Sequence, residues 1–481
     1  MKLSELIKEM NYKEIIGTGD PEIKDISIDS NAVTKGCFFV CLSGGNFDGH
    51  DFIRQVVDYG GVAAIVERPL DTSIIQIVVE DTRVALGEIA AAFYGHCDKK
   101  MKLIGVLGTN GKTTTTHFIT SILTGAGVKC GLIGTLGVFY GGKFKESTLT
   151  TPDPIELYKI LADMYKSGVE AVVMEVSAHA IYLKKVFGLK FEIGVFTNLT
   201  QDHLDFFKDM ETYKKAKTSF FTHNSCKFIV SNSDDAVGRE IALNADDGGN
   251  TITYGIDNPA DVFAIDIVEN KAETAFVLNL FDAIYDVKLN LIGLYNVYNA
   301  LAASAASALY GISPERVVDG LENLKGVSGR LECVYDGEFS VYVDYAHTPD
   351  GLLKSLQTLK NLAENRLICV FGCGGNRDKE KRPIMGRISG ETADFTVLTS
   401  DNPRFEDPMD IIWQVEQGLK EKTDSYVVVE ERAEAIKYAL NFAEKGDVIL
   451  LAGKGSEKYQ EVFGIKRPFN DKDCVKQQLR R

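Results

Sequence analysis

The stretch Ile104-Gly-Val-Leu-Gly-Thr-Asn-Gly-Lys-Thr-Thr-Thr-Thr-His-Phe118 decides the fold of this chain, because in it a hydrophobic strand runs into a glycine turn and then into a helix. Gly108 and Gly111 let the backbone turn tightly and direct its N–H groups inward. Lys112 adds a positive charge at the turn, and Thr113 offers a hydroxyl group to a magnesium ion. The spacing is the Gly-x-x-Gly-Lys-Thr form, shorter than the usual nucleotide-binding loop. The stretch therefore predicts a loop that holds the phosphates of a nucleotide.

Length and composition exclude several classes of protein. The 481 residues are too many for one hydrophobic core and suit about three domains of ordinary size. The net charge of −15 argues against a nucleic-acid partner, which needs clustered Lys and Arg. The 9 cysteines form no Cys-x-x-Cys pair, which favours reduced thiols over disulfides or a zinc site. No apolar run of about 18 residues occurs, so we expect a soluble, cytoplasmic protein with no membrane insertion.

Hydrophobic patterning predicts an α/β fold in three domains. Residues 1–99 read as a small α/β domain, residues 100–328 as a central ATP-binding domain and residues 329–481 as a C-terminal domain of Rossmann-like pattern. In the last two domains, strands rich in β-branched residues alternate with amphipathic helices. This alternation favours parallel sheets with helices on both faces. Residues 262–292 read as an antiparallel appendage. The predicted strands are 37–42, 62–66, 75–79, 103–107, 171–175, 194–197, 228–231, 341–345, 367–371, 395–399, 427–429 and 448–451.

Polar residues follow the predicted central strands where ligands of such sheets gather. Glu175 and Asn198 lie at strand ends, and His203 and Lys217 follow within the next segments. A carboxylate and an imidazole near a bound triphosphate suit Mg²⁺, which prefers oxygen ligands and keeps several waters. Each residue alone is ambiguous, because a lone histidine is more often a core or surface group and Lys217 lies among lysines that suit a solvated helix face.

Nine motifs along the chain resemble, in order, those of the Mur ligases. They are GTNGKTTT at 108–115, EVSAH at 175–179, TNLTQDHLD at 197–205, GLYNVYNALAA at 293–303, GVSGRLE at 326–332, DYAHTPD at 344–350, GCGGNRDKEKRP at 372–383, DNPR at 401–404 and GKGSEKYQ at 453–460. The resemblance covers essentially the whole chain. Within the family, the chain is most similar to the members that add the third residue of the peptide.

The resemblance implies a three-domain, ATP-dependent ligase of peptidoglycan precursor synthesis that acts as a monomer. It would join a diamino acid to UDP-N-acetylmuramoyl-L-alanyl-D-glutamate through an acyl phosphate. The DNPR form accompanies meso-2,6-diaminopimelate in the family. L-lysine and meso-lanthionine remain alternatives for the added residue.

The resemblance also assigns residues to ATP, to Mg²⁺ and to catalysis. Lys112, His203 and Lys217 would be catalytic, and Lys217 would carry a carbamate derived from CO₂ that serves as a magnesium ligand. A free ammonium at that place would repel the metal ion, which gives a physical reason for the modification. Mg²⁺ would be held by Thr113, Glu175, His203 and carbamylated Lys217. ATP would be bound by Gly108, Thr109, Asn110, Gly111, Lys112, Thr113, Thr114, Asn296, Asn299, Arg330 and Asp344.

Two further sets of residues would bind the other substrates. The UDP-sugar dipeptide would meet the N-terminal uridine-binding domain and the central domain, at Ser30, Asn46, Thr150, Thr151, Ser177 and Lys185. The amino acid would meet the C-terminal domain, at Arg377, Asp401, Asn402, Pro403, Arg404, Gly453 and Glu457. Four positions depart from the family pattern: Asn31 and Lys185 replace arginines, Leu183 replaces a glutamine and Ser456 replaces a histidine. Lysine keeps the charge of arginine but loses its bidentate fork.

Three alternatives to this function differ in sequence features. A folylpolyglutamate synthase shares the central fold but lacks the N-terminal uridine-binding domain. The second alternative is a nucleotide-regulated binding protein that hydrolyses ATP slowly. Such a protein needs no amino-acid pocket, whereas the DNPR motif predicts one. The relative that amidates a lipid-linked precursor carries a cysteine zinc ribbon, which this chain lacks.

Overall fold

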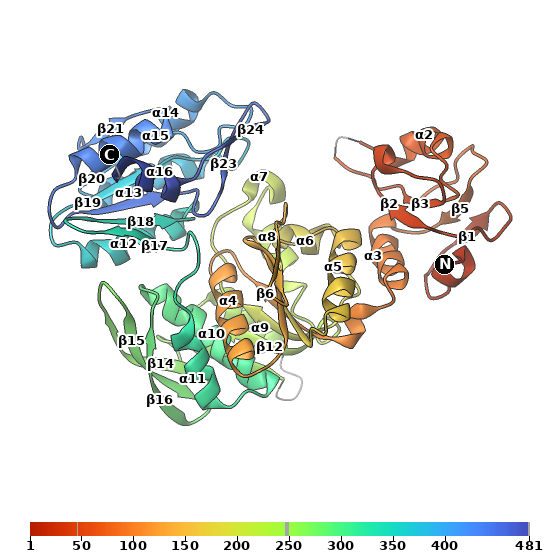
Figure 1. Cartoon of the computed structure of the whole chain (residues 1–481), viewed down its shortest axis with the longest axis horizontal. Helices are drawn as coiled ribbons and strands as arrows, with labels where there is room; N and C mark the ends of the chain where they lie inside the picture. Colours follow the sequence, from red (N-terminus) through yellow and green to blue (C-terminus); the bar gives the residue numbers. More distant parts are fainter. Residues whose placement is uncertain (46, 246–249, 480–481) are drawn as a thin grey trace. The chain divides into compact units, whose positions relative to one another are not determined.

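A computed structural model describes residues 1–45, 47–245 and 250–479 of the chain (Figure 1). The chain folds into two compact units. The first unit is Met1–Gly105, Val128–Gly194 and Ser219–Phe228, and the second is Val106–Gly127, Val195–Thr218 and Ile229–Arg481. The division falls within strands β6 (Lys102–Leu107), β11 (Phe191–Phe196) and β12 (Cys226–Asn232).

The N-terminal part of the first unit is a five-stranded sheet in the order β1-β5-β4-β3-β2, in which only β1 is antiparallel to its neighbour. Strands β3 and β4 are buried at every residue, as expected for parallel strands covered on both faces. Ile53 and Val56 of α2 pack on one face. The elements are α1 (Leu3–Leu6), β1 (Glu14–Ile16), β2 (Asp25–Ser27), η1 (Ser30–Ala32), β3 (Cys37–Val40), η2 (Gly49–Phe52), α2 (Ile53–Asp58), β4 (Ala63–Val66), β5 (Ile75–Val78), α3 (Thr82–Phe93) and η3 (Cys97–Lys100).

The central sheet has eleven strands in the order β16-β15-β14-β13-β12-β11-β6-β10-β7-β8-β9. It is mixed: β10 pairs with β7 and β12 with β13 in parallel, whereas β14, β15 and β16 form the predicted antiparallel appendage. Its further elements are α4 (Lys112–Gly125), β7 (Cys130–Gly134), β8 (Gly137–Tyr140), β9 (Lys143–Lys145), α5 (Pro154–Lys166), β10 (Ala171–Glu175), α6 (Ala178–Tyr182), α7 (Leu204–Phe207), α8 (Met210–Thr218), α9 (Ala236–Asn244), β13 (Thr251–Gly255), β14 (Val262–Glu269), β15 (Thr274–Leu280), β16 (Ala283–Leu289), α10 (Leu294–Tyr310) and α11 (Pro314–Asn323).

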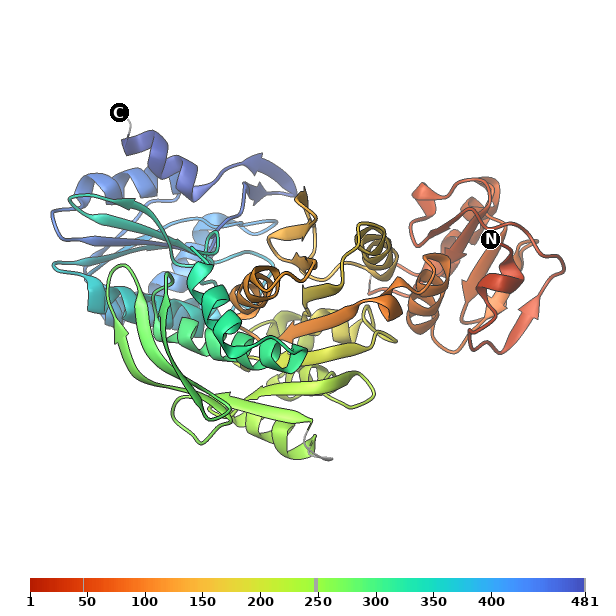
Figure 2. The same cartoon turned by 60° about the horizontal axis from the view of Figure 1, so that its bottom comes forward.

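The C-terminal part of the second unit is a six-stranded sheet in the order β17-β18-β22-β19-β20-β21, parallel except at β17. Figure 2 shows this part of the chain, coloured teal to blue, as a sheet between helices. Helices α12, α13 and α14 pack on one face, and α15 and α16 pack on the other. The elements are β17 (Glu332–Asp336), β18 (Ser340–Asp344), α12 (Pro349–Leu362), β19 (Leu367–Phe371), α13 (Lys381–Thr392), β20 (Phe395–Leu398), α14 (Pro408–Lys420), β21 (Tyr426–Val428), α15 (Arg432–Phe442), β22 (Val448–Ala452), the hairpin β23 (Tyr459–Val462) and β24 (Ile465–Pro468), and α16 (Asp471–Leu479).

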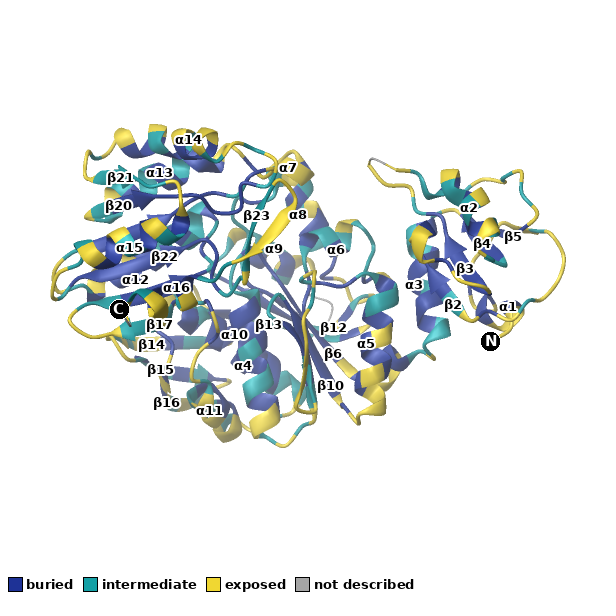
Figure 3. Ribbon diagram, turned by 45° about the horizontal axis from the view of Figure 1, so that its top comes forward, coloured by how far each residue is buried: buried dark blue, intermediate teal, exposed yellow. Residues whose placement is uncertain are grey.

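The buried strands set the places of the functional loops (Figure 3). β6 ends at Leu107 and α4 begins at Lys112, so residues 108–111 form the turn between them and the predicted phosphate-binding residues Lys112, Thr113 and Thr114 begin the helix. β18 ends at Asp344, and β22 ends at Ala452, next to the motif that begins at Gly453. Because β18 and β22 are parallel neighbours, these two ends lie at the same edge of the C-terminal sheet.

Candidate active site

Residues 108–114, called the phosphate loop below, comprise the turn after β6 and the first residues of α4, and the turn has the backbone that its glycines predict. Gly111 has φ +88°, and a Cβ atom there would lie 2.4 Å from Asn299 Oδ1. A Cβ atom on Gly108 would lie 1.8 Å from Thr197 Oγ1. Both positions therefore exclude larger side chains. Lys112 Nζ donates to the carbonyl oxygens of Gly108 and Thr109, at 2.8 Å each, so its ammonium group lies over the loop.

Residues from neighbouring segments hold the phosphate loop in shape. The backbone N–H of Asn110 donates to Asn198 Oδ1 at 3.0 Å, and the carbonyl oxygen of Asn110 accepts from Thr197 Oγ1 at 2.6 Å. The side chain of Asn110 donates to Asp350 Oδ2 at 2.8 Å. The sequence predicts a ligand-facing strand end at Asn198. Its contacts in the structure are those of a side chain that supports the loop backbone.

Asn296 and Asn299, predicted to bind ATP, are one turn apart on α10 and buried. Asn299 Nδ2 donates to Asn296 Oδ1 at 3.0 Å, and Thr115 Oγ1 donates to Asn299 Oδ1 at 3.2 Å. Asn296 Nδ2 donates to the carbonyl oxygen of Ile292 at 2.7 Å. The pair therefore connects α10 to the first turn of α4, directly beside the phosphate loop.

Lys217, on α8, is fully buried beside the same loop. Its Nζ donates to Thr109 Oγ1 at 2.7 Å and lies 4.2 Å from the centre of the Tyr213 ring. The described residues give it no ion pair. Burial, together with the nearby charge of Lys112, holds the pKa of Lys217 well below its ordinary value. The sequence leaves a solvated helix face as the plain alternative for this lysine, and the structure contradicts that alternative.

His203 lies beside Asp202, a buried carboxylate that sequence reasoning did not single out. His203 Nε2 is 3.2 Å from Asp202 Oδ2, His347 Nε2 is 3.6 Å from the same atom, and Lys381 Nζ is 3.5 Å from Oδ1. Burial alone would raise the pKa of Asp202, but the hydrogen bond of His347 and the charge of Lys381 hold it well below its ordinary value. Asp202 thus joins the central and C-terminal segments of the second unit.

Arg330 and Asp344, predicted to bind ATP, also lie at this junction. Arg330 donates to Thr113 Oγ1 at 2.9 Å, and its guanidinium carbon lies 4.4 Å from the centre of the Tyr345 ring. Asp344 accepts from the backbone N–H of Leu331 at 3.1 Å. Burial raises the pKa of Asp344 above its ordinary value. Arg330 therefore touches the phosphate loop directly, whereas Asp344 fixes the segment that carries Arg330.

The residues predicted to bind the amino acid lie close together. Asn402 Nδ2 donates to Glu457 Oε2 at 2.9 Å, and Lys454 Nζ lies 2.8 Å from the same oxygen. A Cβ atom on Gly453, whose φ is +109°, would lie 2.8 Å from Asp401 Oδ2. Sequence reasoning missed the buried Lys454, which neutralises Glu457. We call Asp401, Asn402, Arg404, Gly453 and Glu457 the amino-acid cluster.

Arg404 and Arg377 both lie close to Gly374. A Cβ atom on Gly374 would lie 2.9 Å from Arg404 NH1 and 3.8 Å from Arg377 Cγ. Arg404 NH1 donates to the carbonyl oxygen of Gly375 at 2.8 Å, and its Nε lies 3.6 Å from Glu461 Oε2. Pro403, also predicted to bind the amino acid, packs with its backbone against Gly375. A Cβ atom on Gly375 would lie 1.9 Å from the carbonyl oxygen of Pro403.

In the first unit, the predicted residues at the end of β10 form one hydrogen-bonded group. Glu175 accepts from the backbone N–H of Thr135 at 2.8 Å and from its hydroxyl group at 3.1 Å. Thr135 Oγ1 lies 3.0 Å from Thr150 Oγ1. Thr151 Oγ1 donates to the carbonyl oxygen of Glu175 at 2.9 Å, and the backbone N–H of Ser177 donates to Thr151 Oγ1 at 3.0 Å.

The remaining residues predicted for the UDP-sugar lie elsewhere in the first unit. Ser30 is buried in the 3₁₀ turn after β2. Lys185 Nζ is 2.8 Å from Asp153 Oδ1. Asn46 lies outside the described residues. Asn31, one of the departures from the family pattern, accepts from Gln55 Nε2 at 3.0 Å.

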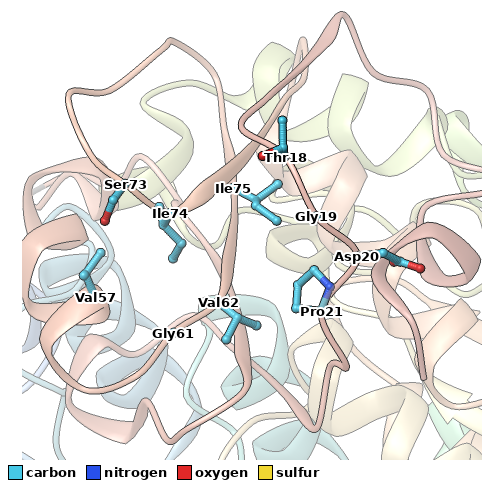
Figure 4. A pocket seen from close by; sticks show the side chains of 10 residues that line it. All are labelled: Thr18, Gly19, Asp20, Pro21, Val57, Gly61, Val62, Ser73, Ile74 and Ile75. Atoms are coloured by element: carbon cyan, nitrogen blue, oxygen red, sulfur yellow. The ribbon is translucent and has the colours of Figure 1, made fainter.

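A separate pocket of about 440 Å³ lies in the N-terminal sheet (Figure 4). Val62 and Ile75 line it at the starts of β4 and β5, and Pro21 closes it from the loop after β1. Ser30 follows the other end of the parallel strands. The pocket therefore lies at the opposite edge of the sheet and contains none of the residues predicted to bind a substrate.

Neither a preformed metal centre nor a membrane span occurs in the described part of the chain. Within residues 1–45, 47–245 and 250–479, no three His, Cys, Asp or Glu side chains gather as a ready-made metal site. The same residues form no helix that is long and apolar enough to span a membrane.

Comparisons with known proteins agree with this architecture. Residues 22–94 match the Mur ligase family catalytic domain, residues 106–307 the Mur ligase middle domain and residues 329–455 the Mur ligase glutamate ligase domain. UDP-N-acetylmuramoyl-L-alanyl-D-glutamate–2,6-diaminopimelate ligase 1 of Clostridium acetobutylicum is 46% identical over 481 residues, which cover 99% of this chain and 98% of the relative.

Solved structures show the same fold. A UDP-N-acetylmuramoyl-L-alanyl-D-glutamate–2,6-diaminopimelate ligase is 31% identical with a TM-score of 0.70 and covers 100% of this chain and 99% of its own. Folylpolyglutamate synthase of Mycobacterium tuberculosis, 17% identical with a TM-score of 0.63, covers 77% of this chain and 92% of its own and shows the fold alone. The three matched domains and the full-length relatives confirm the predicted three-domain α/β architecture, and the chain belongs to the Mur ligase family.

Proposed function

We propose that this chain is an ATP-dependent ligase that adds meso-2,6-diaminopimelate to UDP-N-acetylmuramoyl-L-alanyl-D-glutamate in the cytoplasm, as a monomer. The observation that carries the proposal is that one compact unit holds both the phosphate loop, with Arg330 on Thr113, and the amino-acid cluster. A protein that only hydrolyses ATP needs no such cluster. A ligase needs both sites, because it joins an activated acid to an amine.

The chemistry follows from the poor reactivity of a carboxylate. An oxygen of the glutamate side-chain carboxylate attacks the γ-phosphorus of ATP, and the bond from that phosphorus to ADP breaks. The amine of the diamino acid then attacks the resulting acyl phosphate, loses a proton, and inorganic phosphate leaves. The protein positions the reactants and neutralises charge. Lys112 and the N–H groups of the phosphate loop would hold the β- and γ-phosphates, and Arg330 would approach them from the side of Thr113.

The resemblance to the Mur ligases implies Mg²⁺ and the residues that would hold it. Thr113, Glu175, His203 and carbamylated Lys217 would hold it, and a bound Mg²⁺ would neutralise charge on the β- and γ-phosphate oxygens. Mg²⁺ takes many of its ligands from phosphate and water, so a set with few protein carboxylates suits it.

Carbamylation of Lys217 is part of the proposal and is supported by burial. An amine attacks CO₂ only when it is uncharged, and the lowered pKa of Lys217 favours that form. The resulting carbamate would supply oxygen ligands beside the phosphate loop, next to Thr109.

The UDP-sugar dipeptide would be bound by residues of the first unit, namely Ser30, Asn46, Thr150, Thr151, Ser177 and Lys185. Support for this assignment comes from the relatives named for this substrate and from the hydroxyl groups of Thr150 and Ser177 gathered at the end of β10. Hydroxyl groups of this kind suit the polar edges of a nucleotide sugar.

The test measures ADP release from the purified chain with UDP-N-acetylmuramoyl-L-alanyl-D-glutamate and a panel of meso-diaminopimelate, L-lysine and meso-lanthionine. We expect ADP release that depends on both the dipeptide and diaminopimelate, with the tripeptide product detected by mass spectrometry. ADP release with a reduced folate and glutamate instead would support the folylpolyglutamate alternative. ADP release without any acceptor would overturn the ligase proposal.

A further inference from the structure

Arg382, near the start of α13, is a buried cation outside the residues so far assigned to substrates. Its side chain is 0% exposed and forms a two-point ion pair with Glu406, with NH1 to Oε2 at 2.9 Å and NH2 to Oε1 at 3.0 Å. NH1 also donates to Gln414 Oε1 at 3.0 Å. Paired N–H groups fix both position and direction of a carboxylate, which a single contact does not.

This pair holds two separate loops together. Arg382 NH2 donates to the carbonyl oxygen of Gly374 at 3.2 Å, and Glu406 Oε1 accepts from the backbone N–H of Asn376. Asn376 in turn accepts from the backbone N–H of Phe405 at 3.1 Å. One loop carries Arg377, and the other carries Arg404. The ion pair therefore spans the backbones on which both arginines stand.

The backbones need such support because they are closely packed and partly left-handed. Asn376 has φ +52° and Arg404 has φ +54°, conformations that side-chain-bearing residues adopt at a cost. Gly375 donates to the carbonyl oxygen of Asn402 at 2.9 Å, so the two loops also touch directly. The hydrogen bond from Arg382 also lowers the pKa of Glu406 to about 2, which keeps this carboxylate charged.

We infer that the Arg382–Glu406 pair is a positioning pair for the amino-acid substrate: it sets the places of Arg377 and Arg404 and thereby the recognition of the distal carboxylate of a diamino acid. This inference rests on the proposed function and deepens it. Neither Arg382 nor Glu406 would touch the substrate. Their effect would pass through the two loops, so it should appear in the binding of the amino acid and not in the binding of ATP.

The experiment compares Glu406→Gln and Arg382→Lys with the wild-type chain. Glu406→Gln keeps the shape of the side chain but removes its charge, and Arg382→Lys keeps charge but loses the two-point geometry. We expect each variant to raise the KM for diaminopimelate about tenfold, with kcat and the KM for ATP within about threefold of wild type. Glu406→Asp should recover part of the loss. The matched control is Glu421→Gln, because Glu421, directly after α14, pairs with Arg387 of α13 at 3.2 Å in a partly exposed ion pair.

A double variant shows whether the effect passes through Arg404. In an Arg404→Ala background the further loss caused by Glu406→Gln should be much smaller than in wild type, because the group being positioned is gone. Additive losses, an unchanged KM for diaminopimelate, or parallel losses for all three substrates would each overturn the inference. A wild-type chain that does not use diaminopimelate would instead overturn the proposed function, and the acceptor panel detects that separately.

Discussion

Lys112 is the charged side chain of the phosphate loop, and it contacts the backbone of the loop. Its Nζ donates to the carbonyl oxygens of Gly108 and Thr109. We predict that Lys112→Ala abolishes ligation and leaves the fold intact, because it removes the charge that balances the transferring phosphoryl group. ADP release should fall more than tenfold, a loss of at least about 1.4 kcal/mol of transition-state stabilisation. Lys215→Ala, on the exposed face of α8, is the control. More than about a tenth of wild-type activity in Lys112→Ala would contradict the loop assignment.

Lys217 offers a second prediction at this scale. Lys217→Ala should be nearly inactive, since the side chain that would become a magnesium ligand is lost. Added short carboxylates such as acetate or formate should restore part of the activity by supplying the missing oxygens, whereas chloride at the same ionic strength should not. Kinetics of ADP release measure this. Full activity of the variant, or an unmodified lysine in an active complex examined by crystallography, would rule out the carbamate.

Arg404 is predicted to select the amino acid. A guanidinium can pair with the distal carboxylate of diaminopimelate in a contact worth roughly 1.5–3 kcal/mol, but it repels the distal ammonium of lysine. Glu457 would take the distal ammonium group of diaminopimelate. We expect Arg404→Ala to lower the ratio of kcat/KM for diaminopimelate to that for L-lysine at least about tenfold. Arg467→Ala, on the exposed strand β24, is the control. A wild-type preference for lysine, or an unchanged ratio in Arg404→Ala, would show that this arginine is not the selector.

At the scale of helices and strands, sequence reasoning succeeds where burial is continuous. β19 reads Leu-Ile-Cys-Val-Phe and is buried at every residue, so its pattern predicts a covered strand. β9 and β24 have no buried residue, and β24 ends in a proline. Their hairpin partners, and not their own hydrophobicity, make them strands, so no local pattern predicts them.

The same limit applies to the candidate site. The strand, turn and helix start around the phosphate loop could be predicted because its glycines, lysine and threonines are neighbours in sequence. Asp202 and Lys381 are 179 positions apart, and only the packed fold brings them together. The burial of Lys217 was also hidden, because its helix is rich in lysines and only the fold shows that this one faces Thr109 of the phosphate loop.

The two helices on one face of the C-terminal sheet are joined by a fully buried ion pair. Arg432, at the start of α15, pairs with Asp471, at the start of α16, and both side chains are 0% exposed. Burial alone would lower the pKa of Arg432, but the charge of Asp471 raises it above its ordinary value. Removing one partner leaves an uncompensated buried charge, which costs about 3–5 kcal/mol.

We therefore predict that Asp471→Asn lowers the local opening free energy of α15 and α16 by about that amount. Hydrogen exchange followed by mass spectrometry of the full chain measures it helix by helix. Glu434→Gln, in an exposed pair with Lys437 on the same helix, should change it by less than about 0.5 kcal/mol. Equal exchange in Asp471→Asn and wild type would mean that the buried pair does not hold these helices.

At the scale of the whole molecule, the residues assigned to ATP and those assigned to the amino acid lie in one compact unit, the second. The phosphate loop lies in the segment Val106–Gly127, and the amino-acid cluster lies in the segment Ile229–Arg481. Asp202, Asn110 and Thr113 each contact a residue of the C-terminal part, namely Lys381, Asp350 and Arg330. An amine and an acyl phosphate react only when both are placed within bonding range, so these contacts are where nucleotide binding can act on the amino-acid site.

Arg330 tests this coupling, because it stands on the connection between α11 and β17 and donates to Thr113 in the phosphate loop. Arg330→Ala should lower kcat/KM for ATP at least about tenfold, since it removes both the contact to Thr113 and the stacking on Tyr345. The kcat/KM for ATP of Arg330→Lys should lie between those of the wild type and Arg330→Ala, because lysine keeps the charge without the planar group that stacks. Arg316→Ala, exposed on α11, is the control for changes in the same region. ADP release at saturating dipeptide and diamino acid gives the constants. If Arg330→Ala bound and turned over ATP as the wild type does, the C-terminal part would contribute nothing to the nucleotide site, and the joining of the two chemistries would have to depend on the amino-acid cluster alone.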